Sequence, residues 1–275
     1  METSSGKVAL VTGASGGLGS AIASLLEAAG INVVVTDLLV ERKDQDQTAL
    51  GKSPSAGHSM DRNCVSTDPT VSEVRTTETK SLTLEMDVRN PQNISEVFRR
   101  VEQDLGTVDI LVNNAGLMDN FGLMQVQNPL RWEEHLRVNL TGAFLCSKAA
   151  WTGMVKSSWG RIINISSIAG LMGAFGQPSY GASKAGLIGL TRSLALEGAT
   201  AGITVNAVCP GLIHTDAIKS HKPEFLDRMK NRTAMRRLGT PEEVAAVVLF
   251  LASAAASYVT GAAIPVTGGA DLYTF

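Results

Sequence analysis

Short apolar runs that do not alternate with polar residues recur along this 275-residue chain, and they constrain its fold more than any other feature. Most runs are rich in Val and Ile, which is typical of parallel strands covered on both faces. They lie at residues 7–12, 32–36, 81–86, 108–112, 161–166, 203–208 and 262–266. About seven strands of this kind predict an α/β fold with a doubly wound parallel sheet.

Helical patterns separate several of these runs. Residues 18–29 (LGSAIASLLEAA) carry one such pattern, which ends at Gly30, and residues 131–155 and 179–198 repeat apolar positions at helical spacing. Pro241, followed by two glutamates, indicates a further helix start. Because strands alternate with helices and no boundary indicates a second folded unit, residues 1–275 are predicted to form one domain with right-handed crossovers.

One region lacks this alternation of strands and helices. Residues 41–80 contain no aromatic side chain and few aliphatic ones. A segment of this composition does not bury enough apolar surface to order itself. We interpret it as a polar insert on the surface rather than as a dedicated binding arm.

Composition excludes several classes of function. A net charge of −2 gives no general attraction to nucleic acid or anionic membranes, and no apolar run approaches the ~18 residues of a membrane span. The start of the chain does not read as a secretory signal, so a cytoplasmic protein is expected. Three scattered cysteines and four unclustered histidines predict neither a disulfide scaffold nor a metal site.

The stretch TGASGGLG, residues 12–19, follows the first strand and opens the first helix. Glycines there permit a tight turn and close approach of backbone N–H groups to a pyrophosphate, which the positive end of the helix also attracts. The alternative is a plain structural turn, but the position between strand and helix favours dinucleotide binding. The expected contacts are Gly13, Ser15, Gly17, Leu18 and Gly19.

Asp37 ends the second strand, close to the usual offset of a carboxylate that binds the adenosine ribose hydroxyls. A carboxylate there repels a 2′-phosphate, and no Arg or Lys lies in the glycine loop or at position 38. The expectation is therefore NAD in preference to NADP. The alternative is that Asp37 only starts a turn.

Tyr180 and Lys184 lie one helical turn apart in SYGASKAG, residues 179–186, so both side chains share a helix face. Alone, such a pair is most often solvated. With a dinucleotide nearby, the ammonium would lower the pKa of the phenol toward the operating pH, and the phenol would serve as a proton-transfer group.

With these landmarks in order, the chain resembles the classical short-chain dehydrogenase/reductase family over nearly its whole length apart from 41–80. The other matching motifs are DV at 87–88, NNAG at 113–116, Asn139 in VNL, Ser167 in NISS and PGLIHT at 210–215. The resemblance implies a Rossmann fold and hydride transfer between a nicotinamide cofactor and a secondary alcohol or ketone. The branch it is most similar to contains 3-oxoacyl-(acyl carrier protein) reductases, although the insert is atypical of that branch, whose members commonly favour NADPH.

The resemblance also implies roles for individual residues. Ser167, Tyr180, Lys184 and Asn139 would form a catalytic tetrad, in which Ser167 stabilises the developing alkoxide and Asn139 holds a proton-relaying water. Cofactor contacts, besides Tyr180, Lys184, the glycine loop and Asp37, would be Asp87, Val88, Asn114, Ala115, Gly116, Pro210, Gly211, Ile213 and Thr215.

The implied partners are a small-molecule substrate and further copies of the same chain, in a homotetramer or homodimer. Apolar residues at 116–124 and 168–178 suit a hydrophobic, cyclic, aromatic or 3-hydroxyacyl thioester substrate, but these side chains could equally be core or subunit contacts. Residues 212–238 correspond to a lid in the family. Two alternatives remain: a catalytically silent NAD-binding subunit or regulator, and a nucleotide-sugar epimerase or dehydratase, for which the chain ends too early.

Overall fold

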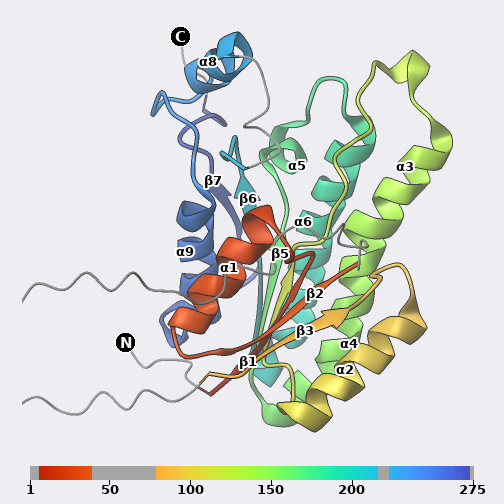
Figure 1. The fold of residues 1–275 in the computed structure, drawn as a ribbon, viewed down its shortest axis with the longest axis vertical. Helices are drawn as coiled ribbons and strands as arrows, with labels where there is room; N and C mark the ends of the chain where they lie inside the picture. Colours follow the sequence, from red (N-terminus) through yellow and green to blue (C-terminus); the bar gives the residue numbers. More distant parts are fainter. Residues whose placement is uncertain (1–5, 39–78, 216–222, 273–275) are drawn as a thin grey trace, which may run out of the picture.

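A computed structural model describes residues 6–38, 79–215 and 223–272 of the protein. Most of the predicted insert at 41–80, Cys64 and part of the predicted lid lie outside these residues. The described strands form one seven-stranded parallel sheet in the order β3-β2-β1-β4-β5-β6-β7 (Figure 1). The strands are β1 (Val8–Thr12), β2 (Asn32–Asp37), β3 (Ser81–Glu85), β4 (Ile110–Asn113), β5 (Gly160–Ile165), β6 (Ile203–Pro210) and β7 (Ala263–Val266). This doubly wound Rossmann sheet confirms the predicted fold class.

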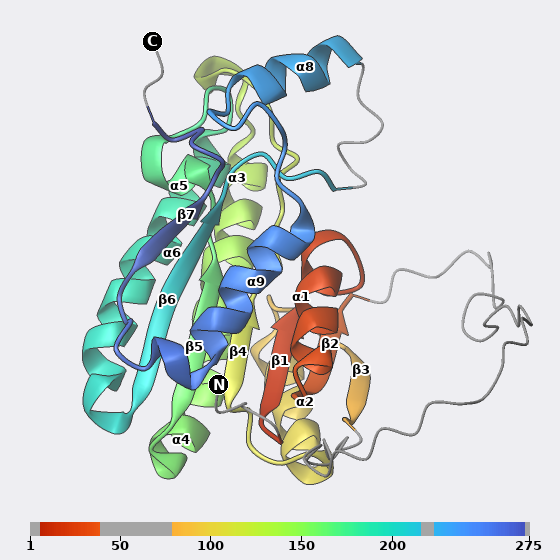
Figure 2. The ribbon, with the colours of Figure 1, turned by 90° about the vertical axis from the view of Figure 1, so that its left-hand side faces the viewer.

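Helices cover both faces of the sheet, as Figures 1 and 2 show. They are α1 (Gly17–Ala28), α2 (Pro91–Asp104), α3 (Pro129–Leu136), α4 (Gly142–Ser157), α5 (Ile168–Met172), α6 (Pro178–Gly198), α8 (Pro223–Asn231) and α9 (Pro241–Ala252). A π-helical turn, Arg137–Thr141, joins α3 to α4, and single 3-10 turns lie at Met124–Val126, Ala199–Ala201 and Ala254–Ala256. None of the helices in the described ranges is both long and apolar enough to cross a lipid bilayer.

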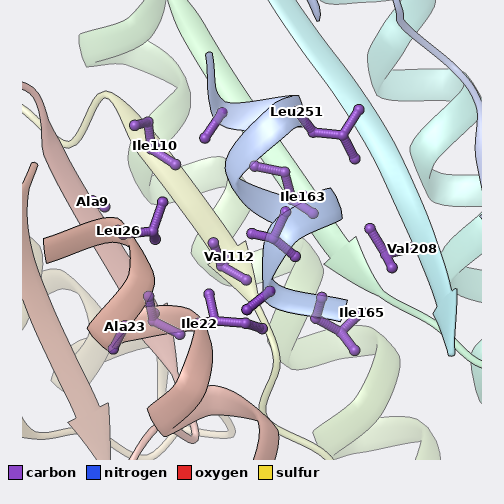
Figure 3. Close-up of a cluster of buried hydrophobic side chains, with 14 of the residues drawn as sticks. Ala9, Ile22, Ala23, Leu26, Ile110, Val112, Ile163, Ile165, Val208 and Leu251 are labelled. Carbon is purple, nitrogen blue, oxygen red and sulfur yellow. The ribbon is translucent and has the colours of Figure 1, made fainter. Parts of the chain in front are cut away.

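Two hydrophobic clusters attach the helix layers to the sheet. On one face, α1 and α9 place Ile22, Leu26 and Leu251 against Ile110 and Ile163 of the central strands (Figure 3). On the other face, α2, α4 and α6 cover the opposite side chains of the same strands. The central strands are therefore buried on both faces, which explains why their sequences do not alternate.

The sequence analysis did not anticipate α2, α5 or α8. Helix α2 carries a clear signal, because the Asn90 side chain accepts hydrogen bonds from the backbone N–H groups of Gln92 and Asn93, and Pro91 occupies the first turn. Its buried residues, Ile94, Val97 and Val101, follow helical spacing. Strand β3, at the sheet edge, alternates between exposed and half-buried residues.

Candidate active site

The predicted site residues come from the carboxyl ends of β1 to β6, from the segments and helices that follow them and, for Asn139, from the π-helical turn. This is the edge at which open α/β sheets bind ligands. The arrangement follows from the parallel sheet, since every strand ends at the same edge. Sequence segments more than a hundred residues apart are thereby brought together.

The glycine loop after β1 leaves room for an anion at the first turn of α1. Gly13 and Gly17 have φ values of +63° and +55°, and a Cβ atom on Gly19 would lie 2.6 Å from the Gly13 carbonyl oxygen. A Cβ on Gly16 or Gly17, by contrast, would meet nothing within 4 Å. Helix α1 also lacks a side-chain N-cap, so its first N–H groups remain available. These residues fit the pyrophosphate of a dinucleotide.

Thr12 and Asn114 hold this loop against the end of β4. The Thr12 hydroxyl accepts from the backbone N–H groups of Asn114 and Ala115, each at 3.0 Å. The Asn114 amide donates to the carbonyl oxygens of Thr12 at 2.9 Å and Gly13 at 2.8 Å. Asn114 therefore supports the loop with its side chain, and Thr12 is a supporting residue that the sequence analysis missed.

A cavity beside the loop collects most of the residues predicted to bind the adenosine half. Its lining includes Gly13, Asp37, Asp87, Val88, Asn114, Ala115 and Gly116, together with Arg89 and Glu134. Arg89 forks onto the Asp87 carboxylate with contacts of 2.9–3.1 Å, and this hydrogen bond lowers the pKa of Asp87. Pro91 and Asn93 of α2 follow directly, and Asn93 Oδ1 accepts from the Asp87 N–H at 2.7 Å.

The segment from Pro210 to Thr215 continues from β6 across the same edge. The Gly211 N–H donates to the Val266 carbonyl at 2.9 Å, and the His214 N–H donates to the Gly239 carbonyl at 2.8 Å. Ile213 is buried and Thr215 is half-buried. These bonds fix the backbone of the segment that was predicted to hold the nicotinamide carboxamide.

Tyr180, Ser167 and Lys184 meet where β5 ends and α6 begins. Ser167 caps α5, its Oγ accepting from the Ala169 N–H at 3.1 Å. Burial raises the pKa of Tyr180, and a hydrogen bond with Ser167 lowers it. The Lys184 ammonium lies 5.7 Å from the centroid of the Tyr180 ring and donates to the Ile165 carbonyl at 2.7 Å. Burial lowers the pKa of Lys184 to about 8.

Asn139, in the π-helical turn, lies close to this group. A Cβ on Gly116 would lie 3.3 Å from Lys184 Nζ and 3.4 Å from Asn139 Oδ1. The Asn139 amide accepts from the Leu117 N–H at 2.7 Å and donates to the Leu117 carbonyl and the Ser183 hydroxyl, each at 3.0 Å. Its side chain is therefore fixed by the backbone of Leu117 and by Ser183.

Comparison with known proteins identifies relatives along most of the chain. The family described as enoyl-(acyl carrier protein) reductase matches residues 59–271. The 3-oxoacyl-(acyl-carrier-protein) reductase FabG of Aquifex aeolicus is 40% identical over 265 residues, covering 96% of this chain and 97% of that protein. The acetoacetyl-CoA reductase of Rhizobium meliloti is 40% identical over 264 residues, covering 96% and 98%. A crystal structure of a candidate gluconate dehydrogenase from Agrobacterium tumefaciens superposes with a TM-score of 0.80 at 32% identity, covering 98% of each chain.

The predicted preference for NAD over NADP is wrong, because these relatives are 3-oxoacyl carrier-protein and acetoacetyl-CoA reductases, which are NADPH-dependent. The structure gives a physical reason for the error. The Asp37 carboxylate accepts the N–H and the hydroxyl of Ser15 at 3.0 and 2.5 Å, and the Leu38 N–H at 2.8 Å. A carboxylate that supports the loop in this way is not sufficient to select the cofactor.

Proposed function

Because the chain belongs to the short-chain dehydrogenase/reductase family, we propose that it is a ketoreductase that interconverts 3-oxoacyl and 3-hydroxyacyl thioesters. The observation that carries this proposal is the convergence of Tyr180, Ser167 and Lys184 beside a glycine loop that fits a dinucleotide. A nicotinamide dinucleotide supplies the hydride when it is bound. The protein positions the carbonyl group and supplies the proton.

In the reductive direction, Tyr180 is the proton donor to the substrate oxygen. Burial raises the pKa of Tyr180, so the phenol keeps its proton at neutral pH and is ready to act as an acid. Ser167 donates a second hydrogen bond to the same oxygen, which stabilises the developing negative charge. Lys184 keeps its proton below a pH of about 8 and places a positive charge under the Tyr180 ring, where it stabilises the phenolate after transfer.

Exposed apolar side chains on the substrate side favour an acyl chain over a polyol. In the 117–128 loop, the segment between β4 and α3, Phe121 and Met124 are 65% and 77% exposed. Met172 and Phe175, near the end of α5, are 61% and 94% exposed. Large apolar groups on one edge of a protein commonly mark a binding surface. A sugar acid such as gluconate would leave them in water.

Turnover of acetoacetyl-CoA tests the proposal. Purified protein is assayed with NADPH and, separately, with NADH, and the absorbance band of the reduced nicotinamide is followed. Gluconate with each oxidised cofactor forms the comparison arm. Reduction of acetoacetyl-CoA supports the proposal, and oxidation of gluconate alone would replace it with a polyol dehydrogenase. Cofactor binding without turnover of either compound would favour a catalytically silent subunit.

We further propose that the protein acts as a homo-oligomer. Helices α4 and α6 leave Phe144 and Leu196 45% and 83% exposed, although both helices lie on the protein's own core. Covering such side chains in a second copy would bury apolar surface. Sedimentation velocity would give the assembly state, and a purely monomeric protein at micromolar concentration would exclude it.

A further inference from the structure

A buried histidine, His135, connects the 117–128 loop to the first turn of α6. Its imidazole is 0% exposed in the last turn of α3. Nε2 lies 2.9 Å from Asp119 Oδ1 in the loop, and Nδ1 lies 3.3 Å from the hydroxyl of Ser179, the residue that precedes Tyr180. We propose that His135 is a positioning residue, which fixes the 117–128 loop against α6 and so shapes the substrate side of the site. This inference rests on the proposed function.

The hydrogen bonds around His135 are consistent with a proton on Nε2. Asn120 Nδ2 donates to Ser179 Oγ at 3.1 Å, so the Ser179 hydroxyl proton is free to point at His135 Nδ1. His135 Nε2–H then donates to Asp119. With a proton on Nε2, the imidazole donates to Asp119 and accepts from Ser179, so each of these three side chains has a partner, as buried polar atoms require. Asp119 and Asn120 are neighbours in the loop. Asp119 is linked to Ser179 through His135, and Asn120 bonds to Ser179 directly.

Asp119 has a second attachment, which lies on the α3 side. Arg131 contacts its other carboxylate oxygen, and Arg131 Nη1 donates to Glu134 at 2.6 Å. Removing the imidazole therefore leaves Asp119 tied to α3 while the link from Asp119 to Ser179 is lost. The loop is expected to loosen from α6 specifically, rather than to detach as a whole.

The loop carries the apolar side chains that would meet an acyl group, so its position matters to substrate binding. Phe121 and Met124 lie on it, and the neighbouring Gly122 N–H donates to the Gly176 carbonyl at 2.9 Å, next to the exposed Phe175. Leu117, where the loop begins, is held by Asn139. Asp119 and Asn120, which bond to His135 and Ser179, lie between these two attachments in the sequence. Loss of the His135–Ser179 contact is expected to weaken substrate binding without moving the proton donor.

Kinetics of His135→Leu, Ser179→Ala and the double variant test this role. The matched control is Glu133→Gln, an exposed position on the same helix. We expect KM for acetoacetyl-CoA to rise about threefold in His135→Leu and about tenfold in Ser179→Ala, because Ser179→Ala also removes the acceptor of Asn120 Nδ2. The double variant should show no further rise beyond Ser179→Ala, because that variant already lacks the link through His135. The value of kcat and the Kd of the cofactor should stay within about twofold of the control. An unchanged KM in either single variant, or effects that multiply in the double variant, would overturn the proposal.

Hydrogen exchange separates this inference from the proposed function. The backbone amides of Leu117 and Gly122 should exchange about tenfold faster in Ser179→Ala than in Glu133→Gln, because the loop opens more often. Inactive wild-type protein would refute the ketoreductase assignment, and the exchange data would still decide the loop attachment. Equal exchange rates would overturn it even in an active enzyme. Ser179→Ala removes a single oxygen atom, so it carries both measurements if His135→Leu does not fold.

Discussion

Lys184 lies one helical turn after Tyr180, with its ammonium 5.7 Å from the centre of the phenol ring and its proton donated to the Ile165 carbonyl. The sequence interpretation expected the ammonium to lower the pKa of the phenol. Burial has the larger effect and raises the pKa of Tyr180, while it lowers that of Lys184 to about 8. The pair is therefore suited to hold a protonated phenol over a protonated amine near neutral pH.

Replacing Tyr180 with Phe should remove the proton donor and leave the fold intact. We expect kcat for acetoacetyl-CoA to fall by about 100-fold or more, the usual contribution of a positioned acid. The Kd of the cofactor, measured by fluorescence titration, should stay within about twofold, because the ring remains. Tyr258→Phe is the matched control, since that side chain is fully exposed. Retained turnover in Tyr180→Phe would show that another group supplies the proton.

The buried ammonium of Lys184 should make stability depend on pH. Its folded pKa of about 8 lies below the ordinary value of 10.5, so the folded state binds fewer protons between these values. The free energy of unfolding should therefore rise with pH across this window. Below it, the protein bears the full cost of burying the protonated Lys184 side chain. We expect the stability advantage of Lys184→Met over wild type to shrink by on the order of 3 kcal/mol between pH 7 and 10.5, at about 1.4 kcal/mol per pKa unit.

Urea unfolding of both proteins at each pH measures this difference. Comparing the two proteins at the same pH cancels other groups, including the thiol of Cys146, whose pKa burial raises to about 12. If the difference in free energy of unfolding between the two proteins stays constant with pH, the folded protein accommodates the Lys184 charge without cost.

Ser15→Ala should weaken dinucleotide binding through the glycine loop. The hydroxyl of Ser15 donates to Asp37 at 2.5 Å, and its loss leaves only the backbone N–H on that carboxylate oxygen. We expect the cofactor Kd to rise about three- to tenfold, the effect of one charge-assisted hydrogen bond in a partly solvated site. Isothermal titration would report the Kd, with Ser24→Ala, at an exposed position of α1, the helix that follows the loop, as the control. Equal Kd values in the two variants would show that this bond does not support the loop.

Replacing either of two helical glycines with alanine should change the free energy of unfolding, but in opposite directions. A Cβ on Gly19 would lie 2.6 Å from both Gly13 O and Asn114 Nδ2, whereas Gly189, exposed in α6, has nothing within 4 Å. Gly19→Ala should lower the free energy of unfolding by about 1–3 kcal/mol through overpacking. Gly189→Ala should raise it by about 0.5–1 kcal/mol by restricting the unfolded chain. Thermal unfolding of the two variants beside wild type gives both signs, and a stable Gly19→Ala would mean that the loop has room to shift.

The apolar runs predicted the sheet because central strands are buried on both faces, and this local property is visible in any single segment. Helix 91–104 was missed although Asn90 and Pro91 mark its start. The contacts around His135 had no local signal at all. Asp119, His135 and Ser179 are separated by 16 and 44 residues, so only the tertiary packing of α3 on α6 brings them together.

The π-helical turn at Arg137–Thr141 has a consequence for how this protein diversifies. One extra residue in a helical turn rotates the faces on either side by about 100° relative to an uninterrupted helix. Helix α3 therefore packs against the 117–128 loop and the start of α6, while α4 packs against the sheet, although the two helices are continuous. Substitutions that adapt α3 to a new substrate need not disturb the packing of α4, so specificity and framework are free to change separately within a single helix.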